Sequence, residues 1–329
     1  MHAILRLRWP RYILWRGLQA IPTLLIIAVL NFSIVQLAPG NAADVLAGEA
    51  GGATPQYMEQ LRHRFGLDKP KPVQLALYIE NVVTFNLGYS FRNNMPVRDL
   101  ILQRLGPTLL LMGTTIVFSI GIGVLLGIWA AARANTWRDH AISVLSMLSY
   151  ATPLFWVGLM LISVFSLRLG WFPTSGMESI GMFYQGWDRV VDIAHHLVLP
   201  AITLSLFYMA LYTRLMRAAM LEQSEMDYVT TARSRGFTEG RITFRHILRN
   251  AILPVVTMGG VQIGALLGGS VVVETVFGWP GMGLLAFQSL FARDVNLLLG
   301  IFFVSACLVV VVNLIVDLIY FVLDPRISV

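Results

Sequence analysis

Six apolar stretches recur along the chain, separated by polar segments of very different length. A helix that crosses the hydrocarbon core of a bilayer needs about 20 mostly apolar residues, and all six stretches meet that length. The pattern therefore predicts an all-α integral membrane protein with six transmembrane helices. The stretches cover residues 13–37, 108–131, 141–167, 196–215, 251–273 and 297–323.

Composition supports this interpretation and narrows the class of protein. The 329 residues are 56% hydrophobic and only 13% charged, against about 25% charged in soluble domains. The net charge of +6 does not indicate a nucleic-acid partner, because the arginines flank apolar spans as membrane orientation requires. Cys307 is the single cysteine, so the chain can form no internal disulfide. His195 and His196 point to different helix faces, and no metal-site pattern occurs.

The positive charges predict which side of the membrane each polar segment occupies. The first 16 residues, the 133–140 turn, the 214–249 segment and the tail carry 14 Arg or Lys residues together, whereas the two short loops on the opposite face carry three. Short cytoplasmic loops are enriched in Arg and Lys, while a long loop crosses regardless of its charge. Both termini are therefore expected in the cytoplasm, and the 38–107 segment outside. The basic start of the chain runs into the first apolar stretch without a cleavage-like end and is interpreted as a retained signal anchor.

The predicted outer loop has turn chemistry followed by an amphipathic helix. Its FGLDKPKP segment favours a turn. An apolar stripe at helical spacing then predicts a helix with one buried face, formed by Leu75, Tyr78, Ile79, Val82 and Val83. Two interpretations stay open: a small packed cap over the helices, or direct contact with a partner.

An Arg-rich segment, residues 227–254, separates the fourth and fifth crossings. Tyr228, Ala232 and Arg235 lie at helical spacing, Gly236 can end that helix in a left-handed conformation, and Thr238 can cap a second helix. Small residues before the glycine allow a partner to approach the backbone closely, and the arginines keep the segment in water. The prediction is a helix–Gly–helix element that meets a cytoplasmic partner; the alternative is a plain solvated loop.

Glycines mark one face of the second and fifth apolar stretches. In lipid, small-residue faces allow close helix contact, because hydrophobicity itself supplies no association force. The expected role is helix packing, and the alternative for the fifth helix is a pathway lining or a sliding interface with a second subunit. The residues are Gly121, Gly123, Gly127, Gly259, Gly260, Gly264, Gly268 and Gly269.

The chain lacks the groups that would power transport or catalyse a reaction. A P-loop needs Gly-x4-Gly-Lys-Ser/Thr, yet the only lysines are Lys69 and Lys71, in the Pro-rich outer turn. Ion-coupled carriers keep ionisable residues at mid-membrane; here Glu274 and Asp317 lie towards helix ends and are interpreted as ion-paired or snorkelling residues. No nucleophile or paired-aspartate pattern indicates an intramembrane protease. Energy is therefore expected from another subunit.

The Arg-rich segment resembles the cytoplasmic coupling motif of ABC importer permeases. That motif is Glu-Ala-Ala, three residues, Gly, nine residues, Ile-x-Leu-Pro. The aligned residues are Thr230, Thr231, Ala232, Gly236 and His246 to Arg249. The Glu, the first Ala, the Ile and the final Pro of the motif are not matched. The peptide and nickel subfamily, however, shows the motif in the forms RTARxxG and RNAxLPVVT, which this segment resembles. Further matches span nearly the whole chain, including ETVFGWPGMG at 274–283 and NLIVDLIY before Asp324, Pro325 and Arg326. The chain is similar to the first of two permease subunits of dipeptide, oligopeptide and nickel ABC importers.

That resemblance implies a type I ABC importer permease in the bacterial inner membrane. It implies a heterodimer with a second homologous permease, one or two cytoplasmic ATPases that hold ATP and magnesium, and an extracytoplasmic solute-binding protein. This chain itself would need no cofactor and no metal, and would contact the lipid bilayer and no nucleic acid. The expected divisions are a cytoplasmic start and first helix at 1–37, an outer loop at 38–107, a five-helix core at 108–323 with a coupling loop at 216–250, and a cytoplasmic tail at 324–329.

Two groups of site residues follow from the resemblance, and no catalytic residue. The group expected to contact the ATPase is Asp227, Tyr228, Thr231, Ala232, Arg233, Arg235, Gly236, Phe237, Arg245 and Asn250. The group expected at the binding-protein docking surface or outer gate is Pro173, Thr174, Ser175, Gly176, Trp279, Pro280 and Gly281.

The sequence leaves alternatives open for the identity of the cargo and for the energy source of transport. Di- or oligopeptides are the leading cargo class, and a nickel chelate or another small solute is the alternative within the family. An ion-coupled secondary carrier is a second hypothesis, and it predicts uptake that survives ATP depletion. Because few polar groups fall at mid-membrane depth, and an apolar pocket separates analogues by only about 1–3 kcal/mol, selection of the cargo is expected in the solute-binding protein.

Overall fold

The computed structural model describes residues 2–37, 56, 59, 68–90 and 92–323. The chain divides into two compact units. The first contains residues 1–106, 284–315 and 328–329, and the second contains residues 107–283 and 316–327. The first part of the expected outer loop and the whole tail at 324–329 lie outside the described residues.

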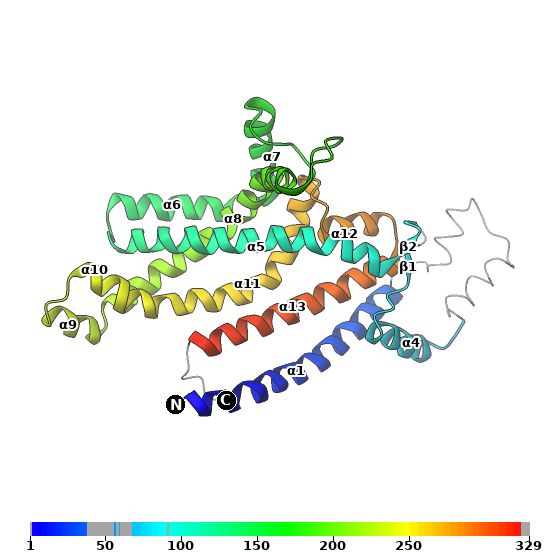
Figure 1. Ribbon diagram of the computed structural model, residues 1–329, viewed down its shortest axis with the longest axis horizontal. Helices are drawn as coiled ribbons and strands as arrows, with labels where there is room; N and C mark the ends of the chain where they lie inside the picture. The colour runs from blue at the N-terminus through cyan, green and yellow to red at the C-terminus, as the bar shows by residue number, and fades with distance from the viewer. Residues whose placement is uncertain (1, 38–55, 57–58, 60–67, 91, 324–329) are drawn as a thin grey trace. The chain divides into compact units, whose positions relative to one another are not determined.

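In the first unit, the predicted amphipathic helix packs on the first crossing. Helix α1 (His2–Leu37) contacts α4 (Lys71–Val83), as Figure 1 shows. The Gln36 side chain donates to the Gln74 amide oxygen over 3.4 Å, and the rings of Phe32 and Tyr78 lie 5.8 Å apart. Within the predicted stripe Val82 is buried, whereas Val83 is 74% exposed. The described half of the outer loop is therefore a packed cap on α1, and a partner contact stays a separate possibility.

A short hairpin and the last helix complete this unit. Strands β1 (Tyr89–Ser90) and β2 (Met95–Pro96) are antiparallel and lead into α5 (Val97–Ala131). Helices α12 (Met282–Phe291) and α13 (Val295–Leu323) return to the same unit through residues 284–315. Asn296 donates from its side chain to the Tyr89 carbonyl oxygen over 3.2 Å. A methyl group on Gly300 would lie 2.6 Å from Val97, so α13 and the start of α5 are in close contact.

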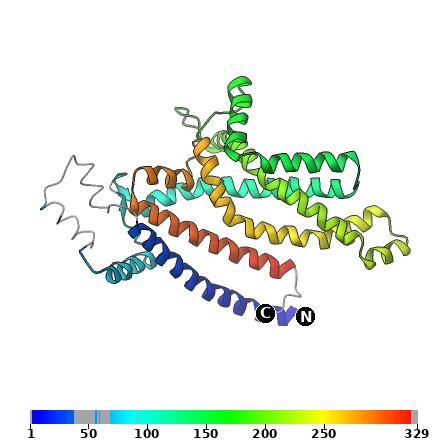
Figure 2. The same cartoon turned by 180° about the vertical axis from the view of Figure 1, so that it is seen from behind.

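The second unit is a helical bundle with its core along α8. Its elements after α5 are α6 (Trp137–Ala151), α7 (Leu154–Leu161), the π-helix η1 (Ile162–Arg168), α8 (Gly186–Ser224), α9 (Asp227–Ser234), α10 (Glu239–Arg241), the π-helix η2 (Ile242–Ile247) and α11 (Leu248–Val276). Figures 1 and 2 show α6 running alongside α5, with α7 turned away from it. Leu204, Tyr212 and Met216 of α8 are buried at the centre of the core.

Two of the predicted glycines explain how closely α5 approaches α8. A methyl group on Gly123 would lie 2.7 Å from Cβ of Tyr212, and one on Gly127 would lie 2.6 Å from Cβ of Met216. At Gly121 the same group would meet nothing within 4 Å. The packing role is thus confirmed for Gly123 and Gly127, and Gly121 lies off the contact face.

The described helices account for up to six membrane crossings. Four are long and apolar enough to cross alone, and two bent helix pairs raise the number to six. The third predicted crossing, residues 141–167, is not one straight helix: α6 and the α7–η1 helix meet at 102°. Pro153 causes the break, since proline lacks an N–H and disfavours helical backbone at the preceding residue. The fifth crossing bends by 43°.

Candidate functional site

Helix α9 ends at the predicted glycine in a complete capping motif. Gly236 has φ +76°, the left-handed region that glycine adopts without steric cost. The Gly236 N–H donates to the Arg233 carbonyl over 2.9 Å, and the Phe237 N–H donates to the Ala232 carbonyl over 3.3 Å. These two bonds form a Schellman motif, which satisfies carbonyls that the helix end would leave unpaired. The chain therefore turns sharply after α9.

One face of α9 packs on the bundle and the opposite face is open. Val229 is fully buried and Ala232 is 4% exposed, both within the core of the second unit. Tyr228 and Phe237 are half-buried. The remaining members of the predicted coupling group are exposed: Asp227, Thr231, Arg233, Arg235, Gly236, Arg245 and Asn250. The structure thus places most of the group at a surface, with Ala232 beneath it.

Charged and aromatic contacts hold the segment after α9. Arg233 donates from Nε to Glu239 Oε1 over 2.9 Å, and this exposed hydrogen bond raises the pKa of Arg233. The Arg241 guanidinium lies 4.7 Å from the centre of the Phe237 ring, and that ring stacks on His246 at 5.8 Å. Arg241 was expected only to keep the segment in water. It also makes a cation–π contact with the first residue after the turn.

The second helix begins where the sequence predicted, but its cap differs. Thr238 occupies the N-cap position, yet its hydroxyl makes no capping hydrogen bond. Thr238 is thus the N-cap residue, as predicted, but without the hydroxyl hydrogen bond expected of a threonine cap; its carbonyl accepts the Ile242 N–H over 3.0 Å, the first hydrogen bond of the helix. From Glu239 the helix continues through η2 into α11. The helix after Gly236 is therefore continuous with the helix of the fifth crossing.

The two parts of the predicted outer group meet in the second unit. The Gly176 N–H donates to the Phe277 carbonyl over 2.8 Å. Gly278 has φ +57°, and a methyl group there would lie 3.5 Å from Ser175. About 100 residues of chain separate these segments. The structure therefore brings residues 173–176 beside the ETVFGWPGMG segment that the sequence singled out.

Beneath this junction lies a buried polar cluster built around Glu274. Its side chain is fully buried and accepts the Thr108 hydroxyl over 2.9 Å, while Thr108 accepts the Met282 N–H over 2.7 Å. A methyl group on Gly281 would lie 2.3 Å from the Glu274 carboxylate. Glu274 is thus a packed interior residue rather than a snorkelling one. Only glycine leaves room for this carboxylate.

The predicted outer residues differ in how accessible they are. Trp279 is fully buried and donates from its indole N–H to the Pro107 carbonyl over 2.9 Å. Gly281 is buried and Pro280 half-buried, as are Pro173 and Gly176, whereas Thr174 and Ser175 are exposed. In this chain, Thr174 and Ser175 are therefore the members of the group that offer side chains at the surface.

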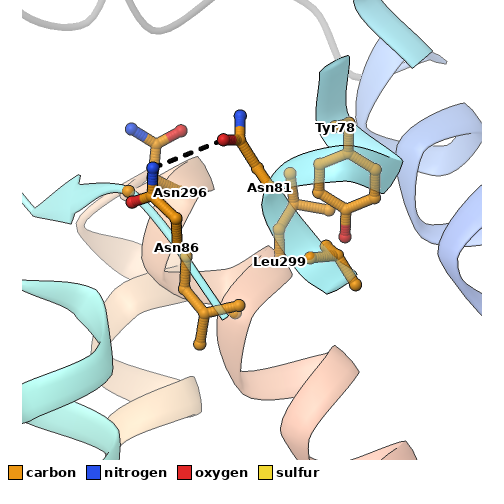
Figure 3. Close-up of a pocket in the computed structure, with 9 residues that line it drawn as sticks. Tyr78, Asn81, Asn86, Asn296 and Leu299 are labelled. Atoms are coloured by element: carbon orange, nitrogen blue, oxygen red, sulfur yellow. Dashed lines mark hydrogen bonds between the residues drawn. The ribbon is translucent and has the colours of Figure 1, made fainter. Parts of the chain in front are cut away.

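The first unit holds a separate, small pocket between α4, the segment before β1 and α13. Its volume is about 150 Å³, and Figure 3 shows Asn81, Asn86 and Asn296 among the residues that line it. Asn86 donates to the Asn81 side-chain oxygen over 3.3 Å. Burial raises the pKa of Tyr78, which lines the pocket, to about 12. The pocket is lined by uncharged groups, and the sequence did not predict it.

Sequence reasoning also missed an ion pair with a buried carboxylate in the second unit. Asp139, in the first turn of α6, accepts Arg217 Nε over 2.6 Å and Arg217 Nη2 over 2.7 Å. The two residues are 78 positions apart, so no local pattern joins them. The only signal in the sequence was the position of Asp139, an acidic residue at the edge of an apolar stretch.

Comparison with known protein families identifies the chain. Residues 123–329 match the family described as binding-protein-dependent transport system inner membrane component, and residues 9–112 match its N-terminal membrane component. The chain belongs to this permease family. The permease is therefore a multi-pass inner membrane protein and the non-enzymatic translocation subunit of an ABC transporter. Its transport system includes a binding protein and an ATPase.

Curated relatives cover almost the whole permease. It is 42% identical to the oligopeptide transport system permease protein AppB of Bacillus subtilis, over 96% of this chain and 99% of that one. A putative peptide permease protein of Brucella ovis is also 42% identical, over 97% and 99%. The dipeptide transport system permease protein DppB of Alkalihalophilus pseudofirmus is 36% identical, over 96% and 99%.

A solved transporter supports the fold of the permease. A chain of the MetNI methionine ABC transporter, in an inward-facing conformation, superimposes with a TM-score of 0.55 at 16% identity. The match covers 68% of this chain and 96% of that chain. At this identity the likeness concerns architecture alone, and it agrees with the type I permease fold expected from the sequence.

Proposed function

We propose that this permease moves di- or oligopeptides into the cytoplasm. The observation that carries the cargo class is similarity along the whole chain, at 36–42% identity, to relatives named as oligopeptide, peptide and dipeptide permeases. The sequence places few charged residues within its apolar stretches, and an apolar path separates similar solutes only weakly. Selection among peptides would therefore belong to the solute-binding protein, and the permease would provide the path.

The α9 surface is the proposed contact with the ATPase. Three features favour it: a short helix with a buried inner face, a sharp Schellman turn at Gly236, and exposed arginines around Thr231. The buried Val229 and Ala232 anchor the helix to the bundle, so a force on α9 reaches the transmembrane helices. Because coupling requires a partner with different contacts in two states, the ATPase would bind α9 differently with and without ATP. ATP and magnesium would be held by the ATPase.

The remaining partners belong to the same proposal. The permease would pair with a second, homologous permease subunit, and both termini would lie in the cytoplasm. The solute-binding protein would dock on the opposite face, over the 38–107 loop and the outer junction. Thr174 and Ser175 are its proposed contacts, with Trp279 and Gly281 supporting that surface from below.

Reconstitution tests this function directly. The complete transporter is placed in liposomes with ATP inside, and uptake of labelled dipeptides, longer peptides and nickel complexes is measured with and without candidate binding proteins. The expected result is saturable peptide uptake that requires both ATP and a binding protein. Selective uptake without any binding protein would contradict the assignment of specificity, and uptake driven by a proton gradient alone would contradict the energy source. Uptake restricted to nickel complexes would contradict the cargo class.

A further inference from the structure

The Asp139–Arg217 ion pair of the second unit joins three parts of the chain. Asp139 lies in the first turn of α6, and its carboxylate accepts both Nε and Nη2 of Arg217 from α8, at 2.6 and 2.7 Å. The same carboxylate accepts the Asn135 N–H over 2.9 Å. Asn135 lies in the turn between α5 and α6, with φ +63°. One carboxylate therefore ties this turn, the start of α6 and the last part of α8 together.

The geometry and burial of the pair make it a stiff connection. The Asp139 side chain is 1% exposed and that of Arg217 is 29% exposed. Paired N–H donors of a guanidinium fix both the distance and the orientation of a carboxylate. Loss of Arg217 would leave the buried Asp139 charge unpaired, which proteins tolerate poorly.

The pair stands next to the proposed coupling helix along the chain. Arg217 lies in the last third of α8, which ends at Ser224, and α9 begins at Asp227. The Tyr228 hydroxyl of α9 donates to the Gln223 side chain of α8 over 2.9 Å, so α9 is tied back to the end of α8. A displacement of α9 would therefore move the end of α8. Through Asp139 it would also move the α5–α6 turn.

We propose that Asp139 and Arg217 are positioning residues that transmit the movement of α9 to the α5–α6 pair. This inference rests on the proposed role of α9 as the ATPase contact. It assigns the 133–140 turn an active part in the transport cycle, since the turn moves with α8 instead of serving only as a connection. Arg217 acts through Asp139 and touches neither cargo nor nucleotide.

The first test measures transport and ATP use in the reconstituted complete transporter. Arg217→Lys keeps the positive charge but loses the paired donors, and Asp139→Asn keeps the side-chain shape but loses the negative charge. We expect ATP hydrolysis to continue while the number of peptides moved per ATP falls by about tenfold, within the range of measured coupling between sites. An unchanged ratio in Arg217→Lys would overturn the proposal. So would equal losses of hydrolysis and transport that match a loss of assembled complex, because these indicate a structural role alone.

A matched control is the exposed pair of Glu178 and Arg189, whose contact of 2.7 Å is similar in length but lies outside this cluster. Arg189→Lys should leave transport per ATP unchanged. If Asp139→Asn does not assemble, Arg217→Lys decides the question. A wild-type transporter that moves no peptide would contradict the proposed function and not this inference, which the next measurement tests without cargo.

The second test follows the movement itself. In a Cys307→Ser background, an environment-sensitive fluorophore is placed at Arg133→Cys in the turn, or at Ser234→Cys at the end of α9, outside the proposed contact group; both positions are exposed. ATP binding should change the signal at both sites in the otherwise unaltered transporter. With Arg217→Lys, the response at residue 234 should remain and that at residue 133 should be lost. Equal responses at residue 133 with and without Arg217→Lys would refute the transmission.

Discussion

At the scale of single residues, Gly236 shows how one backbone conformation sets the shape of a proposed contact. Its positive φ completes the Schellman motif, and no atom lies within 4 Å of a methyl group placed there. A substitution would therefore cause backbone strain without an internal clash. We expect Gly236→Val to cost about 1–2 kcal/mol, because a β-branched residue resists left-handed backbone. Expression should persist, whereas co-purification of the ATPase and transport should fall.

Two controls separate strain at Gly236 from a general effect on this surface. Asn tolerates left-handed backbone better than most non-glycine residues, so Gly236→Asn should retain most ATPase binding. Gly240 is also exposed with open space around it but has no positive φ, and Gly240→Ala should be neutral. Normal ATPase binding and full transport by Gly236→Val would indicate that residues 227–254 are only a solvated loop.

A second pair of glycines tests close helix packing. A methyl group on Gly127 would lie 2.6 Å from Cβ of Met216 and 2.8 Å from the Thr213 carbonyl, whereas one on Gly121 meets nothing. Gly127→Ala should lower the unfolding free energy by about 1–3 kcal/mol, as overpacking does. Gly121→Ala lies on the same helix and should be neutral or slightly stabilising. Thermal unfolding of the purified protein measures both, and equal stability of the two variants would contradict the close α5–α8 contact.

At the scale of elements, α9 has one face against the bundle and one face open, and this asymmetry can be tested chemically. In a Cys307→Ser background, Thr231→Cys should react quickly with a charged maleimide, because residue 231 is exposed. Val229→Cys, two residues earlier and fully buried, should react slowly. Addition of the ATPase should protect residue 231 and leave the rate at residue 229 unchanged. A rate at residue 231 that the ATPase does not alter would exclude this face as the contact.

At the scale of the whole molecule, the distribution of positive charge predicts the orientation of the chain. The predicted cytoplasmic segments carry 14 Arg or Lys residues, against three in the short loops of the other face, and this bias sets orientation. Reporter fusions at Gly51, Gly186 and Ser328 should read outside, outside and inside. Gly51 and Ser328 lie outside the described residues, so the fusions test what the structure does not. An outside result at Ser328 would contradict the arrangement of six crossings with both termini in the cytoplasm.

The sequence by itself determined the features that depend on neighbouring residues. Hydropathy over about 20 residues predicted the crossings, helical spacing predicted α4 and α9, and the glycine after α9 predicted its left-handed end. These are local preferences of the backbone and of apolar side chains, and the structure confirms them. Pro153 was also a local signal, but the hydropathy of 141–167 continues across it, so the break between α6 and α7 was not predicted.

Tertiary structure alone decided which distant residues meet. Asp139 pairs with Arg217, and Gly176 bonds to Phe277, across 78 and about 100 residues of chain. Trp279 was predicted at the binding-protein docking surface or the outer gate. Packing within this chain buries it, and burial depends on what other helices bring beside a residue. Thr238 takes the N-cap position that the sequence predicted, but its hydroxyl makes no capping hydrogen bond there. A single sequence specifies the faces of its helices, but only their packing specifies the partner that each face receives.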